Sequence, residues 1–209
     1  MAQRLKGLLA WHTETALHLL RLTPPWVLLI PAAGAVALYV LNAYPAIAPY
    51  LDKETAEIIS PIILGVAVAM AAWLALTRRH VYDKWQLVFA ISLFLRELHF
   101  PGTNTGFYIA LVVLLVWASH ARDRLEPFFS DKRIVVPLMA MLWTYFITKL
   151  LDRGYLDGGL PAGTTRDLFE ENLEILGHLT FVILVVLSFR VVRAGAASRA
   201  ADASASPRS

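Results

Sequence analysis

The chain contains a series of apolar segments that are about as long as a lipid bilayer is thick. A helix needs about 18 or more apolar residues to cross about 30 Å of hydrocarbon, and several such stretches follow one another here. Apolar residues make up 57% of the 209 residues, against about 45–50% in soluble domains. Because backbone amides in lipid must be satisfied within their own segment, we predict an all-α integral membrane protein.

We predict a bundle of six transmembrane helices within residues 23–193. The expected spans are residues 26–44, 58–77, 85–99, 105–119, 134–151 and 168–192. The third and fourth spans are short for a full crossing. The turn between them, at residues 100–104, should therefore lie within or just below the membrane interface.

The two ends of the chain differ from the bundle. Residues 1–22 carry apolar side chains at roughly helical spacing among charged ones, but they are too polar to span a membrane. We predict an amphipathic helix in the membrane interface, with a partly ordered tail as the alternative. Residues 194–209 are small, polar and Arg-containing, which predicts a disordered cytoplasmic tail.

Lys and Arg are distributed unevenly over the predicted loops. The loops on one side hold Arg4, Lys6, Arg21, Arg78, Arg79, Lys84, Arg122, Arg124, Lys132, Arg133, Arg193, Arg199 and Arg208, and the opposite loops hold only Lys53, Arg153 and Arg166. The basic side of a membrane protein is normally cytoplasmic, so both termini are expected there. A five-span topology with a re-entrant hairpin would break this alternation.

Composition also excludes several kinds of site. The chain has no cysteine, which rules out disulfides, thiolate metal sites and a cysteine nucleophile. Its basic residues are scattered over loops, so we expect the lipid bilayer, and not nucleic acid, as its partner. The sequence does not predict an oligomeric state.

Charged residues gather where three predicted spans meet the extracytoplasmic side. Arg96, Glu97 and His99 end the third span, Lys149 and Asp152 end the fifth, and Arg166, Asp167, Glu170, Glu171, Glu174 and His178 begin the sixth. Charged side chains inside spans are costly and mark functional sites by default. We therefore predict that these three polar stripes face one another around a cavity open to the extracytoplasmic side.

The sixth span carries the most regular pattern. At 100° per residue, Asp167, Glu171, Glu174 and His178 fall within a stripe of roughly 60°. On the third span the polar face holds Ser92, Arg96 and His99, and Glu97 lies off it. A purely structural interpretation competes with this one, because acids near a helix N-terminus complement its dipole and Arg96, Lys149 and Arg166 can pair with them. That interpretation suits Asp167 and Glu170 better than the deeper Glu174 and His178.

The residue types suggest acid–base or metal chemistry. The predicted catalytic set is Glu97, His99, Asp152, Glu171, Glu174 and His178, of which Glu171, Glu174 and His178 are the expected ligands of a divalent metal such as Zn, Mn or Fe. Arg96, Lys149 and Arg166 are expected to hold an anionic headgroup. The spacing matches no H-E-x-x-H or E-x-x-H signature. A metal-free acid–base pair or a proton relay remains the alternative.

Two segments carry a resemblance to known sequences. Residues 95–100, LRELHF, and residues 169–178, FEENLEILGH, resemble stretches of small bacterial multi-pass membrane proteins that have no assigned function. The resemblance extends to the order of spans and implies a bacterial inner membrane location, but it implies no activity. The seven-span ceramidase-type metal hydrolases offer only a loose analogy, since their paired-histidine pattern on a late helix is absent here.

Three functions remain open at this point. The first is a hydrolase or transferase that acts on a lipid or lipid-linked substrate at the outer leaflet. The second is a proton- or cation-coupled carrier or channel, which would need a polar path to the cytoplasm. The third is a non-catalytic subunit or assembly factor of a membrane complex.

Overall fold

All regular structure in the described part of the chain is helical. The computed structural model describes residues 2–162 and 164–205. Its helices are α1 (Ala2–Leu22), α2 (Ile30–Asn42), α3 (Lys53–Arg78), α4 (Val81–Glu97), α5 (Thr103–His120), α6 (Arg122–Phe129), α7 (Lys132–Asp152) and α8 (Arg166–Ala205). Short 3-10 turns lie at η1 (Pro25–Leu29), η2 (Ala48–Tyr50) and η3 (Asp157–Gly159).

Several of these helices are long and apolar enough to cross a membrane, as the composition predicts. Within the described residues these are Pro25–Asn42, Lys53–Arg78, Lys132–Asp152 and Arg166–Val191. The pair α5 and α6 meets the same criteria when joined, although the chain bends by 101° between them. Helix α4 has 17 residues, fewer than the about 20 of an ordinary span. The predicted all-α class is confirmed, and four helices are long and apolar enough to span a membrane, or five if the bent pair forms one span.

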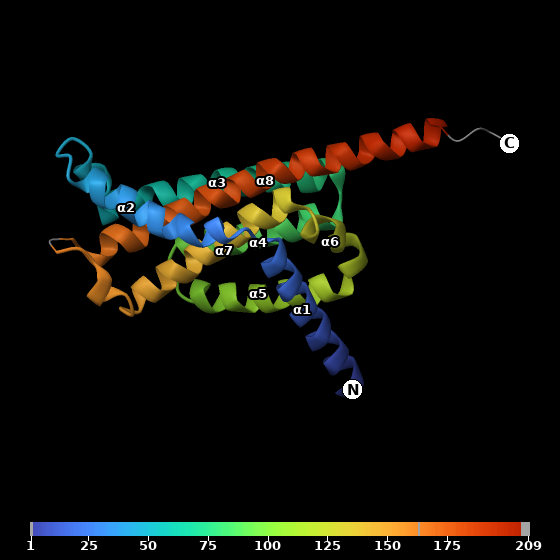
Figure 1. Cartoon of the computed structure of the whole chain (residues 1–209), viewed down its shortest axis with the longest axis horizontal. Helices are drawn as coiled ribbons and strands as arrows, with labels where there is room; N and C mark the ends of the chain where they lie inside the picture. Colours follow the sequence, from blue (N-terminus) through green and yellow to red (C-terminus); the bar gives the residue numbers. More distant parts are fainter. Residues whose placement is uncertain (1, 163, 206–209) are drawn as a thin grey trace.

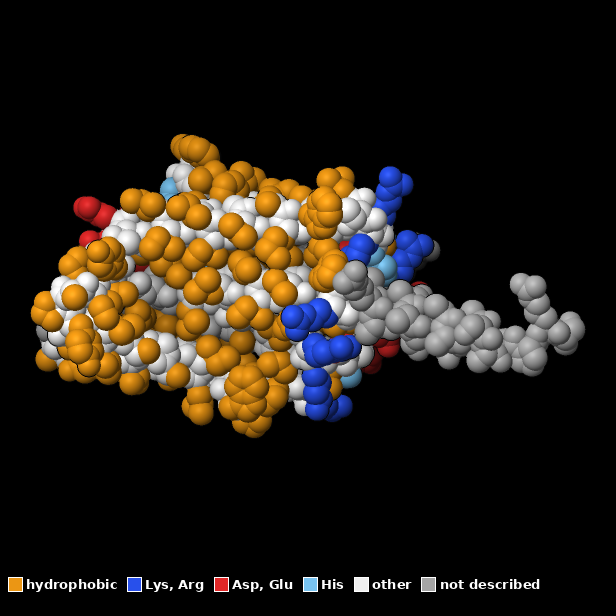
Figure 2. Space-filling view, turned by 90° about the horizontal axis from the view of Figure 1, so that it is seen from above, with side chains coloured by type: hydrophobic (Ala, Val, Ile, Leu, Met, Phe, Trp, Pro, Cys, Tyr) orange, Lys and Arg blue, Asp and Glu red, His pale blue; other side chains and the backbone are white. Residues whose placement is uncertain are grey.

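The long helices run side by side and reverse direction at each turn (Figure 1). The connections after α2, α4 and α7 lie toward one end of the bundle. The connections after α3 and α5, together with the end of α8, lie toward the opposite end. We call these the acidic end and the basic end. Figure 2 shows Lys and Arg side chains gathered near the basic end, with apolar side chains spread over the rest of the face in view.

Local signals in the sequence explain where the helices begin. Asp52 and Asp131 cap α3 and α7, because their carboxylates accept hydrogen bonds from the backbone N–H groups of Thr55 and Arg133 at 2.7 and 2.8 Å. The His80 ring caps α4 in the same way, accepting from Tyr82 N–H at 3.2 Å. Gly102 has φ +89°, a conformation that favours glycine, and lets the chain turn sharply from α4 into α5.

Helix α8 packs along α7 and α3, and α4 packs along α3 and α5. The main apolar core lies between these helices and includes Leu64, Phe89, Met141 and Phe181. A second, smaller apolar cluster (Leu151, Leu168, Phe169 and Leu173) joins α7 and α8 near the acidic end. The residues of α8 between these two clusters are the ones that carry the polar site.

The structure differs from the sequence prediction at two places. Helix α6 lies in a region predicted to be only a loop, and Leu125, Phe128 and Phe129 bury its apolar face. Helix α8 continues to Ala205, so the backbone of 194–205 is helical and not disordered; alanine recurs through this stretch and is the strongest helix former. Residues 206–209 of the predicted tail lie outside the described residues. Residues 2–22 form one helix, α1, which contacts α5 and α7.

Candidate functional site

Three acid and histidine side chains from two helices meet inside the bundle near the acidic end. Glu97 of α4 and Glu174 and His178 of α8 each offer a ligand atom, and these atoms all lie within 4.8 Å of one another. We call them the Glu–Glu–His cluster. The side chains of Glu97 and His178 are only 6% and 1% exposed, and that of Glu174 is 11% exposed. The predicted convergence of polar groups is present, but it forms a nearly sealed cluster and not an open cavity.

The depth of the cluster follows from where α4 ends. Glu97 is the last residue of α4, yet its carboxylate lies beside His178, which is 12 residues into α8. At 1.5 Å per residue, the end of α4 therefore lies about 18 Å along α8 from its start. His99 follows with φ +51° and turns the chain away toward α5. The C-terminus of a helix carries a partial negative charge, so α4 directs this end of its dipole at the cluster.

Arg96 supplies the positive charge beside the cluster. Its guanidinium donates a short hydrogen bond to Glu174 Oε1, and it stacks over the Phe107 ring of α5 at 5.8 Å from the ring centre. Arg96 and Glu97 are neighbours at the end of α4, and they pair with Glu174 and His178, which lie one turn apart on the same face of α8. Glu97 therefore belongs to the cluster, although helical periodicity put it off the polar face of its span.

Tyr145 of α7 holds the ring of His178 in place. Its hydroxyl lies 2.7 Å from His178 Nδ1, and the tyrosine ring packs against the imidazole at 5.6 Å between centres. Gly177 makes this approach feasible, because a Cβ atom there would lie 2.6 Å from Cε1 of Tyr145. Tyr145 was not predicted as a site residue; the glycine directly before His178 is the sequence signal of close packing that could have pointed to it.

The other ring nitrogen of His178 has no hydrogen-bond partner. His178 Nε2 is fully buried and unbonded, and it faces Glu97 Oε2 at 3.6 Å, which is too long for a hydrogen bond. Most metal-binding histidines are oriented through the ring nitrogen that does not bind the metal. The Tyr145 hydroxyl occupies that position here, and it leaves Nε2 directed at the two carboxylates.

The remaining predicted site residues lie outside the cluster. Glu171, predicted as a metal ligand, turns toward α3 and pairs with Lys53 at 3.3 Å. Lys149 and Asp152, one turn apart on α7, pair with each other at 2.5 Å. Arg166 lies 3.9 Å from Asp157, which belongs to the turn η3 in the loop between α7 and α8. His99 is exposed, and its Nδ1 lies 2.6 Å from the carbonyl of Glu97. Asp167 is also exposed, and Glu170 is half-buried.

A second buried polar group lies near the basic end. Asp83 of α4 is fully buried and pairs with Arg78 of α3, whose Nε donates to Asp83 Oδ2 at 3.1 Å. Arg78 also donates to the carbonyls of Ser188 and Phe189 at 3.2 and 3.3 Å, so it joins α3, α4 and α8. Gln86 completes this group through a 3.2 Å hydrogen bond with the Ser188 hydroxyl. We call these residues the Arg78–Asp83 group.

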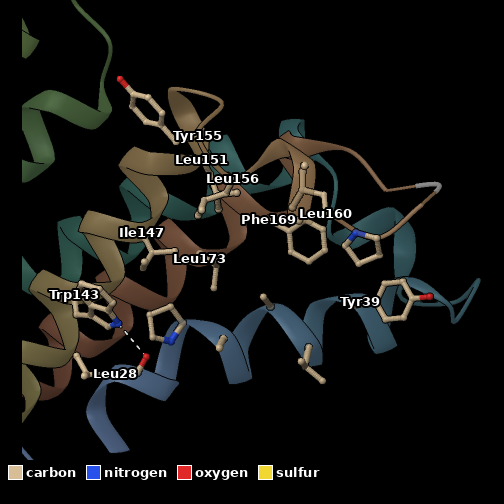
Figure 3. Close-up of a pocket in the computed structure, with 17 residues that line it drawn as sticks. Leu28, Tyr39, Trp143, Ile147, Leu151, Tyr155, Leu156, Leu160, Phe169 and Leu173 are labelled. Atoms are coloured by element: carbon tan, nitrogen blue, oxygen red, sulfur yellow. Dashed lines mark hydrogen bonds between the residues drawn. The ribbon is translucent and has the colours of Figure 1, made fainter. Parts of the chain in front are cut away.

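An apolar groove of about 620 Å³ opens between α2, α7 and α8 near the acidic end. Figure 3 shows η1 and α2 as one wall, from Leu28 to Tyr39, with Trp143, Ile147 and Leu151 of α7 and Leu173 and Phe169 of α8 opposite it. The loop after α7 covers one end with Leu156 and Leu160. At the other end the Trp143 indole donates to the Leu28 carbonyl at 3.0 Å.

The comparisons with known proteins found no relative. No family model matches the chain, and no curated protein or solved structure matches it either. What this chain does must therefore be inferred from its own geometry.

Proposed function

We propose that this chain is a membrane-embedded enzyme in which Glu97, Glu174 and His178 bind a divalent metal ion and act on a lipid or lipid-linked substrate. The observation that carries the proposal is the unbonded Nε2 of His178, buried and directed at two carboxylates. An unpaired buried polar atom is costly. A cation bound by all three side chains would satisfy it.

The net negative charge of the cluster favours the binding of a cation. Glu97 and Glu174 bring two negative charges, and Arg96 brings one positive charge to the same place. The dipole of α4 adds further negative potential. The cluster is therefore short of positive charge in a low-dielectric setting, and a metal ion or a proton on His178 would supply it. A set of one nitrogen and two oxygen ligands suits Zn, Mn or Fe.

The ligand set also suits catalysis. Three protein ligands leave a further coordination position for water or substrate, as in catalytic zinc sites. A bound metal would lower the pKa of such a water and so generate a nucleophile at neutral pH. Within the chain, Tyr145 orients His178, and Arg96 neutralises Glu174. Of the three predicted headgroup-binding residues, Arg96 and Lys149 hydrogen-bond to acids, whereas Arg166 makes only a long ion pair with Asp157 at 3.9 Å.

We further propose six spans, with α4 and α5 each crossing, α1 in the interface and both termini in the cytoplasm. The alternation of the connections between the two ends of the bundle and the basic residues at one end support this topology. A reporter fused at Gly158 should then report the outside, and one fused after Arg124 should report the cytoplasm. A cytoplasmic signal at Gly158 would put the cluster on the opposite side of the membrane.

A proton-coupled carrier is the second candidate. Asp83, Gln86 and Ser188 place buried polar groups on α4 and α8 near the basic end, as a proton path would require. Between them and the cluster, however, the rings of Phe89 and Phe181 meet edge to face at 5.4 Å. Phe181 and its neighbour Leu184 are buried in the main core. This apolar layer disfavours a through-path and supports the enzyme. A non-catalytic subunit remains the third candidate.

The experiment is a product search with purified protein in proteoliposomes made from bacterial lipid extract and supplied with Zn, Mn or Fe(II). Lipid products present with wild type and absent with His178→Ala would support the enzyme. The same vesicles, loaded with a pH-sensitive dye, would reveal a carrier as proton uptake. Proton uptake without any new lipid product would replace the enzyme by the second candidate.

A further inference from the structure

We propose that the groove between α2, α7 and α8 is a binding site for one acyl chain of a phospholipid whose phosphate lies beside Arg166. The site is separate from the Glu–Glu–His cluster. Phe169 and Leu173 line the groove from one face of α8, whereas Glu174 is turned by about 100° from Leu173 around the helix. The proposal therefore rests on the membrane location of the chain and not on a bound metal.

The shape of the groove fits a single chain. The wall formed by η1 and α2 runs from Leu28 to Tyr39, and these 12 residues span about 16 Å at about 1.5 Å per step. One leaflet of a bilayer has about 15 Å of hydrocarbon, half of the whole. The lining is almost entirely apolar, with Ile147, Leu151, Phe169 and Leu173 facing α2 (Figure 3). The groove thus has the length and the chemistry of one acyl chain in one leaflet.

The loose attachment of α2 creates the groove. Close contacts hold the first half of the span Pro25–Asn42: Trp143 donates to the Leu28 carbonyl of η1, and Gly34 of α2 lies so near α8 that an added Cβ would be 2.8 Å from the Leu176 side chain. Only 11% of its span is buried, against 50% for that of α7. Beyond Gly34, Ala35 and Leu38 still pack against the apolar cluster of α7 and α8, but Val36 and Tyr39 are left 64% and 48% exposed. Apolar side chains in such a gap need an apolar occupant, and within a membrane that occupant is lipid.

The charges at the end of the groove indicate where the headgroup lies. The covering loop carries Gly158, Gly159 and Leu160 into the groove, and the neighbouring Asp157 lies 3.9 Å from Arg166. That distance is too long for a hydrogen bond, so the half-exposed guanidinium keeps donors for a phosphate. Phe169, in the groove, is one helical turn after Arg166. Tyr39 and Tyr155 line the same end, and tyrosines gather at the level of lipid headgroups.

Native mass spectrometry in detergent with added phosphatidylglycerol tests the proposal. We expect one saturably bound lipid per chain. Val36→Trp should fill the groove from its exposed wall and weaken this binding about tenfold or more. Val112→Trp places the same ring on the 60%-exposed position of α5, away from the groove, and should leave binding unchanged. Equal binding in both variants would overturn the proposal. A wild-type dimer without bound lipid that Val36→Trp converts into monomers would also overturn it, because the groove would then be a dimer interface.

Arg166→Gln tests the headgroup separately. It should weaken phosphatidylglycerol binding by about five- to tenfold, since a charge-assisted hydrogen bond is lost, and leave diacylglycerol binding unchanged. Equal losses for both lipids would remove Arg166 from the site.

In wild type, phosphatidylglycerol with brominated acyl chains should quench the tryptophan fluorescence of Trp143, and this quenching should be missing in Trp143→Phe. Absence of quenching in wild type would contradict an acyl chain in the groove. Metal content should be the same in wild type and Val36→Trp, which separates this proposal from the metal site.

Discussion

The two buried polar groups on α4 and α8 differ in how their charges are matched. Near the basic end, one guanidinium (Arg78) meets one carboxylate (Asp83) and uses a further donor on the carbonyls of α8. Near the acidic end, one guanidinium (Arg96) meets two carboxylates and a histidine with an unbonded nitrogen. The first arrangement is complete without a ligand. The second is completed by a cation.

The unbonded atoms in the two groups sharpen this contrast. Gln86 Nε2 also lacks a partner. Rotating the side-chain amide by 180° would let Nε2 donate to the oxygen of the Ser188 hydroxyl. That oxygen can accept, because the hydroxyl itself donates to the Val185 carbonyl at 2.7 Å. His178 has no such remedy, because flipping its ring would break the contact with Tyr145. A ligand is therefore needed only at the acidic end. The difference between a structural and a functional buried charge can be tested by removing charges one at a time.

The largest expected effect is at the complete group. Asp83→Asn leaves the Arg78 guanidinium without its counter-charge, and breaking a buried pair this way costs about 3–5 kcal/mol of unfolding free energy. Thermal unfolding in detergent measures the loss. Lys84→Gln, at the exposed neighbouring position, removes a charge from the same turn and should change stability by less than about 0.5 kcal/mol. A stable Asp83→Asn protein would mean that the pair is not structural.

Packing around His178 should give the next largest effect. In Gly177→Ala the new methyl group would collide with the Tyr145 ring, and overpacking of this kind costs about 1–3 kcal/mol. Gly65→Ala is the matched control, since its Cβ would meet Phe94 at an ordinary 3.8 Å and alanine favours the helix by about 0.5–1 kcal/mol. Equal melting temperatures for both variants would contradict the close approach of Tyr145 to α8.

The ion pair of Asp131 and Arg133 at the start of α7 provides a comparison with the buried charges. Hydrogen bonding to Arg133 lowers the pKa of Asp131 below its usual value. The contribution of Asp131 to stability is therefore present at neutral pH and is lost as the pH falls through that lowered pKa, below about pH 4. Asp131→Ala should cost about 1 kcal/mol at pH 7 through loss of the α7 cap, and the difference from wild type should shrink in acid. A constant difference from pH 7 to pH 3 would exclude the ionised cap.

The smallest effect is expected at the incomplete group. Glu174→Gln leaves Arg96 beside Glu97, so the remaining charges balance. We expect its unfolding free energy to lie within about 1 kcal/mol of wild type, although a buried carboxylate has been replaced. Unfolding in detergent, compared directly with Asp83→Asn, measures this. A loss as large as that of Asp83→Asn would make Glu174 a structural ion-pair residue.

The sequence predicted the fold class and the end of the bundle where the polar cluster lies better than it predicted which residues form the cluster. Long apolar segments directly predict membrane helices, and charged residues near their ends direct attention to one end of the bundle. Helical periodicity also put Glu174 and His178 on one stripe. It could not show that Glu171 reaches Lys53 of α3 instead, because the depth and rotation of neighbouring helices depend on packing. Glu97 was predicted in the catalytic set but not as a metal ligand, because periodicity put it off the polar face of its helix and could not show that α4 ends beside His178.

The proposed metal site is tested most directly by measuring metal content in two matched variants. Purified wild type, incubated with Zn, Mn or Fe(II) and then desalted, should hold about one ion per chain. Glu97→Gln, which keeps the Arg96–Glu174 pair, should lose the ion and melt at the temperature of metal-free wild type. Glu171→Gln removes the carboxylate that pairs with Lys53 and should keep the ion. A wild type that holds none of these metals, or retention in Glu97→Gln with loss in Glu171→Gln, would contradict the Glu97, Glu174 and His178 site.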